Sequence, residues 1–319
     1  MNNIEKAKEI GFSEALYVSG RVSIADLFSK TRRSGIYLLH FVNNEAYYGQ
    51  AVDVTRRFCQ HLKTHTDITH IQFQEHSRDK LNEVEKKKIE ELENLKFRLH
   101  NISLVTLPIG ESDFDLVMAV DNQENWLKNL RYYGERTHRM NEPQFRENYK
   151  RKYQALKSKP FFLEIIKFLK EYVKIAIPSV ERTEMAFWAI SCLPSTSVKD
   201  ETVYSRINLG WQEVLTVYET DNQVFFSFHM SKEQMERGFG RGFRKLFFFH
   251  PRLHYSDHMY AQGGQDQIHF TVYGVKQALR FIKEKCVQLA IRKFNHRLMK
   301  KSVCVYSRYH CFDLADAII

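Results

Sequence analysis

Five side chains between residues 37 and 85 form a set that suits the hydrolysis of a phosphodiester. Arg57 and His61 are four positions apart, so on a helix they project from the same face. Tyr37 and Tyr47 lie in two short apolar runs, and Glu85 lies in a strongly charged segment. In phosphodiester cleavage a carboxylate can hold a divalent metal, cationic side chains balance the charge on phosphate, and a phenol or imidazole transfers the proton. The set indicates this chemistry if the fold brings its members into one cleft.

The elements that must position these side chains are predicted by the pattern around them. Asn43, Asn44 and Glu45 form a turn-prone spacer between two apolar runs, which favours a β-hairpin. Asp53 is a favourable N-cap for a helix in which apolar residues recur at four-residue intervals. The pattern thus predicts strands over 35–42 and 46–51, a helix from 53 to about 62, a strand over 71–74 and a charged helix over 78–96.

These landmarks also resemble those of the GIY-YIG nucleases. The two-part signature of that family is matched by Gly35-Ile36-Tyr37 and, ten residues on, by Tyr47-Tyr48-Gly49. The later landmarks of the family are matched by Arg57, His61, Glu85 and Asn101. The chain departs from the family at Tyr48, where Ile or Val is usual, and in a polar insertion over 64–69, which we expect to affect length and not chemistry. The resemblance covers roughly 70 residues, from 34 to about 110.

The resemblance implies an α+β fold whose nuclease core is a three-stranded antiparallel sheet flanked by helices. It also implies hydrolysis of DNA at a single divalent cation, Mg²⁺ or Mn²⁺. In that scheme Glu85 binds the metal and Arg57 stabilises charge on the phosphate. Tyr37 is the first candidate for the general base, helped or replaced by His61, and Tyr47 orients the phosphate or the water. The remaining implied roles belong to Asn101, which holds the geometry of the site, and to Gly35 and Gly49, which allow close approach of the backbone.

The positive charge of the chain is unevenly distributed. The formal net charge is +10, but residues 1–110 carry 16 Lys and Arg against 14 Asp and Glu. Residues 230–301 carry 15 against 5, which matches the whole excess. A local positive field of this kind favours phosphate backbones and predicts DNA as the partner. The residues that we expect to contact DNA are Arg237, Arg241, Arg244, Lys245, Lys283, Arg292 and Lys293.

Outside the nuclease-like module the pattern predicts three further segments. Residues 1–33 form a lead-in with short helices over 4–10 and 23–29. Residues 111–177 form a helical connector, with helices over 121–133, 145–156 and 159–177. Residues 178–319 form a basic α+β domain for DNA binding or target recognition. This last segment is predicted to contain strands over 185–193, 203–209, 213–218, 223–229 and 267–273, a helix starting at Ser231, and a long helix over 274–300.

Several other features limit the class of protein. Five cysteines without a CxxC pair argue against a disulfide framework and a structural zinc site. His250, His254 and His258 would align as metal ligands only on a helix, which Pro251 disfavours, so solvated or phosphate-facing histidines are the preferred interpretation. No apolar run has the length of a membrane helix, and the N-terminus lacks a secretory h-region, so we expect a cytoplasmic protein that avoids the membrane.

The sequence therefore predicts a metal-dependent DNA endonuclease, restriction-like or related to phage defence, whose C-terminal half selects the target. Homing or mobile-element endonucleases and structure-specific repair nucleases remain alternatives. A nucleic-acid-binding protein with an inactive nuclease core is the alternative of another class. One such site cuts one strand, so double-strand cleavage would require a homodimer or sequential nicking.

Overall fold

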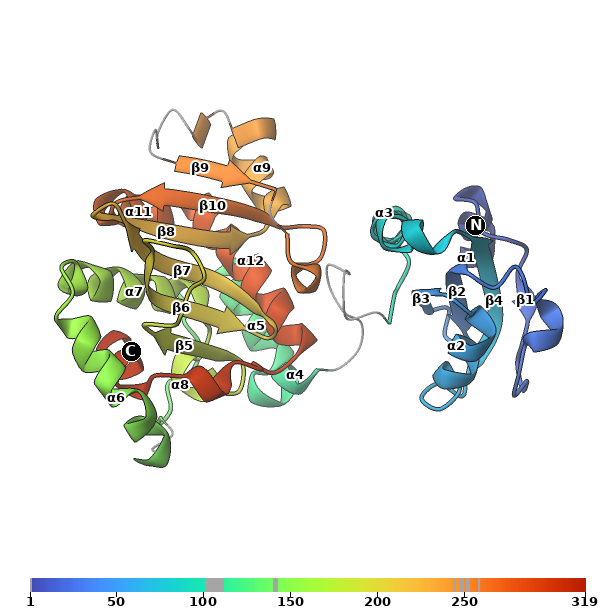
Figure 1. The fold of residues 1–319 in the computed structure, drawn as a ribbon, viewed down its shortest axis with the longest axis horizontal. Coiled ribbons are helices and arrows are strands. Elements are labelled where there is room, and N and C mark those ends of the chain that lie inside the picture. Colours follow the sequence, from blue (N-terminus) through green and yellow to red (C-terminus); the bar gives the residue numbers. More distant parts are fainter. Residues whose placement is uncertain are drawn as a thin grey trace. The chain divides into compact units, whose positions relative to one another are not determined.

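The chain forms two compact units, Met1–Ile109 and Gly110–Ile319, in this computed structural model. Each unit combines helices with an antiparallel sheet, which confirms the expected α+β class (Figure 1). The structure describes residues 2–100, 112–139, 143–243, 245–246, 250, 253–257 and 259–319, without the side chains of residues 82, 86 and 144. Among these residues no helix is long and apolar enough to span a membrane.

The sheet of the N-terminal unit is built on the expected hairpin. Strands β2 (Gly35–Phe41) and β3 (Ala46–Ala51) pair antiparallel, and β4 (Ile68–Glu75) pairs with the other side of β2. Strand β4 is longer than the predicted 71–74 because its pairing with β2 continues to Ile68 beyond an irregularity at His40 and Phe41. A two-residue strand that was not predicted, β1 (Leu16–Tyr17), pairs with β4, so the sheet has four strands in the order β1-β4-β2-β3.

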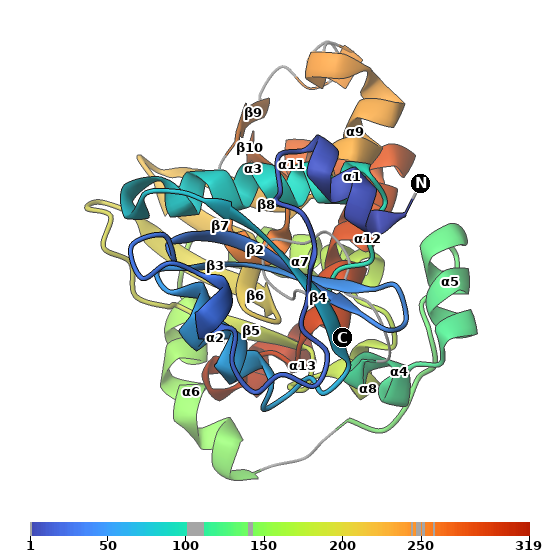
Figure 2. The ribbon, with the colours of Figure 1, turned by 90° about the vertical axis from the view of Figure 1, so that its right-hand side faces the viewer.

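Alternation along β2 divides the N-terminal unit into two apolar layers. Ile36 and Leu38 pack on one face with helices α1 (Asn3–Glu9) and α3 (Leu81–Asn94). Tyr37 and Leu39 pack on the other face with helix α2 (Val54–His61). Figure 2 shows the strands between α3 and α2. Side chains at neighbouring positions of β2 therefore pack against helices on opposite faces of the sheet.

The ends of these helices follow the predicted signals in part. The side chain of Asp53 accepts hydrogen bonds from the backbone N–H groups of Thr55 and Arg56, which confirms it as the N-cap of α2. The predicted helix over 78–96 is a 3₁₀ turn, η2 (Arg78–Lys80), followed by α3. The predicted helix over 23–29 is only a 3₁₀ turn, η1 (Ala25–Leu27).

The sheet of the C-terminal unit has six antiparallel strands in the order β5-β6-β7-β8-β10-β9 (Figure 1). Asp221 and Asn222 have φ values of 51° and 56° and form the tight turn predicted between β7 and β8. Five of the strands were predicted, and β9 was not. Their bounds are β5 (Trp188–Cys192), β6 (Thr202–Leu209), β7 (Gln212–Thr220), β8 (Gln223–Met230), β9 (Leu253–Ser256) and β10 (Ile268–Tyr273).

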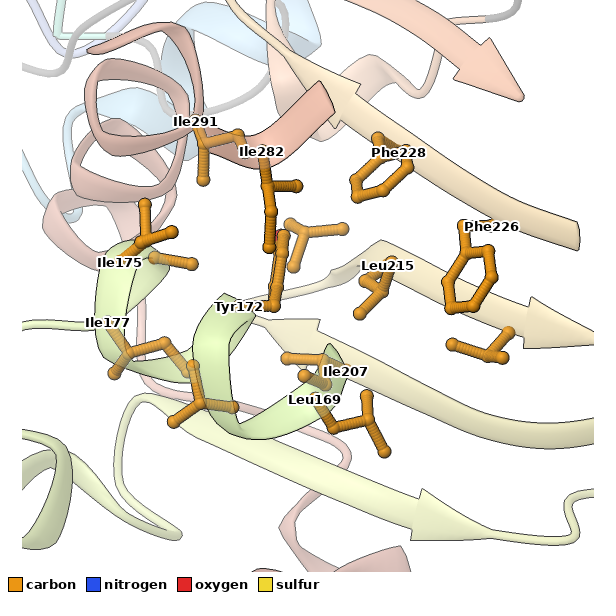
Figure 3. Packing of buried hydrophobic residues seen from close by; sticks show 14 of the residues in the cluster. Leu169, Tyr172, Ile175, Ile177, Ile207, Leu215, Phe226, Phe228, Ile282 and Ile291 are labelled. Carbon is orange, nitrogen blue, oxygen red and sulfur yellow. The ribbon is translucent and has the colours of Figure 1, made fainter. Parts of the chain in front are cut away.

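Helices cover one face of this sheet and form the main core of the unit. Figure 3 shows Leu169 and Tyr172 of α7 (Phe162–Ala176) facing Ile207, Leu215 and other apolar side chains of the strands. The other helices before the sheet are α4 (Asp113–Val117), α5 (Val120–Lys128) and α6 (Pro143–Lys157), and the short α8 (Val180–Thr183) leads into it. Segment 111–177 thus packs as part of the same unit as the sheet.

The predicted long helix over 274–300 is wrong, because the structure contains two helices there. Helix α11 (Val275–Lys283) and helix α12 (Lys285–Lys301) are separated by Glu284, whose φ of −63° and ψ of 124° are extended. The break redirects the chain, so α11 and α12 each bury apolar side chains in the core of the unit. Helix α9 (Lys232–Phe239) begins after Ser231 as predicted, since the Ser231 hydroxyl accepts from the backbone N–H of Gln234. The final helix, α13 (Phe312–Ile318), was not predicted.

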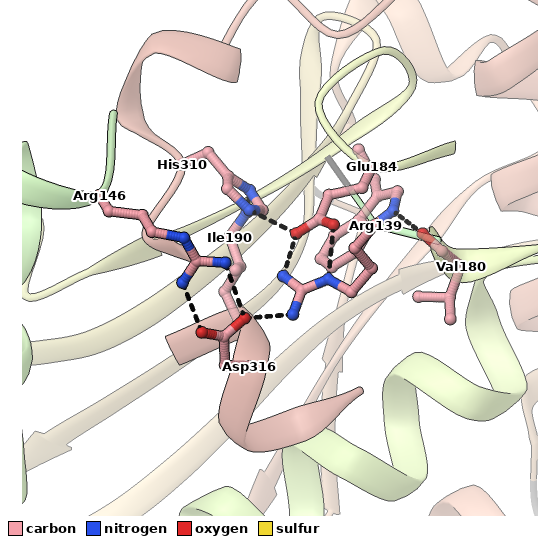
Figure 4. A network of polar contacts seen from close by, with 8 residues as sticks. Arg139, Arg146, Val180, Glu184, Ile190, His310 and Asp316 are labelled. Carbon is pink, nitrogen blue, oxygen red and sulfur yellow. Dashed lines mark hydrogen bonds and ion pairs between the residues drawn. The ribbon is translucent and has the colours of Figure 1, made fainter. Parts of the chain in front are cut away.

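A buried polar network ties α13 to the start of the sheet (Figure 4). Glu184, 1% exposed in its side chain, accepts from Arg139 and from Nε2 of His310 at 2.9 Å. The backbone N–H of Ile190 donates to Nδ1 of His310, so a neutral His310 must carry its proton on Nε2. Asp316 of α13 pairs with Arg139 and with Arg146 of α6. The network joins three segments that are distant in sequence.

Arg292 corrects one predicted DNA contact. Its side chain is completely buried, and it donates to the backbone carbonyls of Ile175 and Asn129 at 2.9 Å and of Leu130 at 3.3 Å. Its guanidinium also lies 4.8 Å from the ring centre of Trp126. Burial lowers the pKa of Arg292 to about 10, so it is still charged at neutral pH. The residue binds helix ends of its own unit and cannot reach a phosphate.

Replacing Arg292 with Met should destabilise the C-terminal unit by about 3 kcal/mol, because several buried carbonyls lose their donor. Urea unfolding followed by tryptophan fluorescence measures this unit alone, since all three tryptophans lie after residue 110. The adjacent Lys293→Met is the control, and we expect a change within about 0.5 kcal/mol. Equal unfolding midpoints for both variants would contradict the structural role of Arg292.

Candidate active site

Three of the predicted catalytic side chains are in direct contact. The hydroxyl of Tyr37, on β2, lies 2.7 Å from Nε2 of His61, at the end of α2. Nε of Arg57, one turn earlier on α2, donates to the same hydroxyl at 3.4 Å. The four-residue spacing of Arg57 and His61 thus places both side chains against one phenol.

Tyr47 joins this group from the neighbouring strand. Its ring is nearly parallel to that of Tyr37, with centres 6.3 Å apart, and its centre lies 4.4 Å from that of His61. Residue 47 is opposite Leu39 and residue 49 is opposite Tyr37 in the β2–β3 register. Tyr37 and Tyr47 therefore belong to the face of the sheet that carries α2.

Gly49 makes the position of the Tyr37 hydroxyl possible. A Cβ at position 49 would lie 2.5 Å from the Tyr37 oxygen, so any side chain there would displace the phenol. Position 35 also excludes a side chain, since a Cβ there would lie 2.1 Å from the backbone oxygen of Gln74. Both predicted glycine positions thus require close approach of other atoms. Because β3 ends the sheet order, Gly49 lies on an edge strand.

Glu85 approaches this edge from the other face of the sheet. It lies on α3, and its Oε2 accepts from Nε2 of Gln50 at 3.0 Å. Gln50 directly follows Gly49 on the edge strand. The Glu85 carboxylate and the Tyr37 hydroxyl therefore approach adjacent residues of β3. Burial raises the pKa of Glu85, against the lowering effect of the Gln50 hydrogen bond. Glu83, the other carboxylate in this turn, is exposed.

Burial is the main cause of the shifted pKa values of Tyr37 and His61. It raises the pKa of Tyr37, assisted by the neighbouring Tyr47 and opposed by Arg57, so Tyr37 is a neutral phenol at pH 7. It lowers the pKa of His61 to about 4, assisted by the charges of Arg57 and His65. His61 is then a neutral imidazole that can accept the Tyr37 proton on Nε2, while the Tyr37 oxygen accepts from Arg57.

Sequence reasoning missed Gln50, His65 and His100 as neighbours of the site. Gln50 orients the carboxylate of Glu85. The ring of His65 lies 6.0 Å from His61 and 5.9 Å from His100. The position of His65 four residues after His61 was a usable signal, but His65 falls in the 64–69 insertion, which we had expected to affect length alone. Gln50 and His100 carried no comparable signal, because only the folded edge strand brings them near.

The chemistry of the donor set fits a hard divalent cation at Glu85. Within the described part of the chain, no group of three or more His, Cys, Asp or Glu could hold a metal. Mg²⁺ is commonly held by one or two carboxylates and completes its shell with water and phosphate oxygens. The half-buried Glu85, oriented by Gln50, meets that requirement, and a bound cation would favour its charged form.

The remaining predicted residues differ in their surroundings. Asn101 and Arg244 lie outside the described residues. Arg241, Lys245 and Lys283 are exposed, as DNA contacts must be. Arg237 and Lys293 both pair with Glu233, which offsets part of their charge. In the histidine series, His250 is buried, His254 is exposed on β9, and His258 lies outside the described residues.

The chain matches no family model, and neither the curated proteins nor the solved structures contain a significant match to it.

The Cε1 resonance of His61 should titrate with a midpoint of about 4. Because an unfolded histidine titrates near 6.5, the unfolded chain binds more protons between these values, and His61 makes the folded unit lose stability as the pH falls from about 6.5 to 4. Arg57→Gln should raise the midpoint, since it removes a positive charge beside the ring. Arg56→Gln, at an exposed position, should leave it unchanged. A wild-type midpoint near 6.5 would refute the buried, neutral imidazole.

Proposed function

We propose that the chain is a metal-dependent DNA endonuclease of the GIY-YIG type that hydrolyses phosphodiester bonds. The observation that carries this proposal is the Tyr37 hydroxyl, held between Arg57 and His61 directly over Gly49. A neutral phenol with a proton acceptor on one side and a permanent cation on the other suits proton transfer beside an anionic substrate.

The roles of the chain's own residues follow from their exposure and hydrogen bonds. Arg57 is exposed, so a phosphate group can contact it. Its charge offsets the negative charge that develops on the phosphate oxygens. Tyr37 takes a proton from the attacking water as its own proton passes to Nε2 of His61. His61 helps Tyr37 in this way or replaces it as the base. Tyr47, whose ring lies beside both, orients the phosphate or the water.

Glu85 would hold the cation, Mg²⁺ or Mn²⁺, with Gln50 fixing the carboxylate. When bound, such a cation supplies Lewis-acid stabilisation of charge on the phosphate. The charge of Arg57 favours negative charge on the Tyr37 oxygen, which burial disfavours. Nearby cationic charge is what makes a phenol a usable base at neutral pH.

The basic residues of the C-terminal unit would bind the DNA backbone and present the target. Arg241, Lys245 and Lys283 are exposed cations in the segment that carries the excess charge. We propose a restriction-like, defence-related role in the cytoplasm, because the small DNA-binding repeats of homing enzymes and the helix-hairpin-helix elements of repair nucleases are not evident in the sequence. Double-strand cleavage would then use a homodimer or two successive nicks.

Glu85→Gln should abolish Mg²⁺-dependent cleavage of plasmid DNA, because an amide does not replace the charge of a carboxylate toward a cation. The exposed Glu83→Gln, two residues earlier on the same helix, is the matched control and should retain cleavage. Agarose gels of cleavage and a filter-binding assay of DNA affinity measure the two properties separately. Cleavage by Glu85→Gln at the wild-type rate would refute the metal role of this residue.

Lys283→Glu should weaken DNA binding and reduce the slope of log affinity against log salt by about 1, because one phosphate contact is lost. Lys170→Glu, at an exposed position of α7 outside the basic segment, makes the same change in net charge. If the two variants bind DNA equally, net charge governs affinity and the proposed local contact is wrong.

A further inference from the structure

A cleft of about 430 Å³ opens on the C-terminal unit beside β5, β6 and the start of β7. This volume is near the lower end of the range of small-molecule sites, about 300–1,000 Å³, and suits one nucleoside. Aromatic side chains line much of it, among them Tyr149, Trp211, Tyr306 and Tyr309. Trp211 is 56% exposed and Tyr309 is 42% exposed. Such exposed rings offer stacking surfaces for a flat ligand.

The polar wall of the cleft contains a buried acceptor that lacks a donor. Gln212 is only 1% exposed, and its Nε2 donates to Oε1 of Gln267 at 3.4 Å. Gln267 is itself held by the backbone of Tyr260, which donates to the same Oε1 at 3.1 Å. This orientation leaves Oε1 of Gln212 without a hydrogen-bond partner among the described residues. A buried amide oxygen in this state favours a ligand that brings an N–H donor.

The walls of the cleft are held in place by contacts within the unit. The hydroxyl of Tyr306 donates to the backbone oxygen of Trp211 at 3.4 Å. The backbone N–H of Val305 donates to the backbone oxygen of Gly210 at 3.0 Å. Opposite them, Glu213 accepts from Tyr260 at 2.8 Å and pairs with Arg206 at 3.3 Å. The stacking surface and the polar wall are therefore in place before a ligand binds, which lowers the entropic cost of binding.

One cation lines the cleft, and a second lies against one of its rings. Lys152, on α6, is exposed and lines the cleft. Arg308 is exposed, and its guanidinium lies 4.7 Å from the ring centre of Tyr309. A nucleotide whose base entered the cleft would place its phosphates near these charges. The combination of flat rings, a buried acceptor and outer cations matches the chemistry of a nucleotide.

We propose that this cleft binds a single nucleobase of DNA taken out of the stack. The ring of the base stacks on Trp211, and an N–H group of the base donates to Oε1 of Gln212. All four bases carry an N–H donor, as the exocyclic amino group of cytosine, adenine and guanine or as N3–H of thymine. The inference rests on the proposed endonuclease function, since it gives the C-terminal unit a means of holding one base of the target.

Titration of the full-length protein with dCMP, dAMP, dGMP and dTMP, without metal, tests the proposal. Trp126 and Trp188 are completely buried, so fluorescence quenching by a stacked base reports Trp211. We expect saturable quenching by at least one of the four nucleotides. The same affinities measured by equilibrium dialysis should fall at least five-fold in Trp211→Ala, while Phe145→Ala, an exposed aromatic outside the cleft, should bind as the wild type does.

Gln212→Met should weaken nucleotide binding, because it removes the acceptor, and a far-UV spectrum equal to that of the wild type would show that the fold is kept. The proposal is overturned if none of the four nucleotides quenches saturably, or if Gln212→Met and Trp211→Ala both bind like the wild type. Because the titration contains no metal and measures no cleavage, its failure leaves the proposed reaction intact. Conversely, unimpaired cleavage by Glu85→Gln would remove the metal assignment and leave nucleotide binding intact.

Discussion

The close approach of Tyr37 to Gly49 is the contact on which the candidate site depends. With a Cβ at position 49 only 2.5 Å from the Tyr37 oxygen, the phenol could not occupy its place between Arg57 and His61. The missing side chain also keeps the edge strand bare where the phenol lies. Gln50, the next residue, then orients Glu85 from the other side of the sheet. Gly49 thus allows the phenol to contact the cation and the imidazole, and its neighbour Gln50 contacts the carboxylate.

The two units differ in charge. The N-terminal unit is nearly neutral and holds the candidate catalytic residues, whereas the positive excess lies in residues 230–301. Burial decides what that charge can do. Arg292 satisfies backbone carbonyls inside the unit, and Glu233 offsets part of the charge of Arg237 and Lys293. Arg241, Lys245 and Lys283 are exposed, so a phosphate backbone can reach them. The number of basic residues in the segment is therefore larger than the number that a phosphate backbone could contact.

Local signals predicted much of the fold because they act within a few residues. Turn residues such as Asp221 and Asn222 and caps such as Asp53 and Ser231 formed as expected. Long-range packing decided the rest. The extended backbone at Glu284 breaks an otherwise continuous helical pattern, and β1 exists only because β4 offers an edge. For the site, spacing predicted the joint position of Arg57 and His61. Gln50 and the burial of Arg292 depend on contacts that no local pattern encodes.

The central claim is that the Tyr37 hydroxyl takes part in proton transfer during DNA hydrolysis. Single-turnover rates of plasmid cleavage with Mg²⁺, measured for the wild type and for Tyr37→Phe at saturating protein, test it most directly. Loss of a general base typically costs about 10²–10⁴-fold in rate, and the account predicts a loss in that range for Tyr37→Phe. Tyr17→Phe, at a largely exposed position of the same unit, should cut at the wild-type rate. Equal rates for Tyr37→Phe and the wild type would contradict the account.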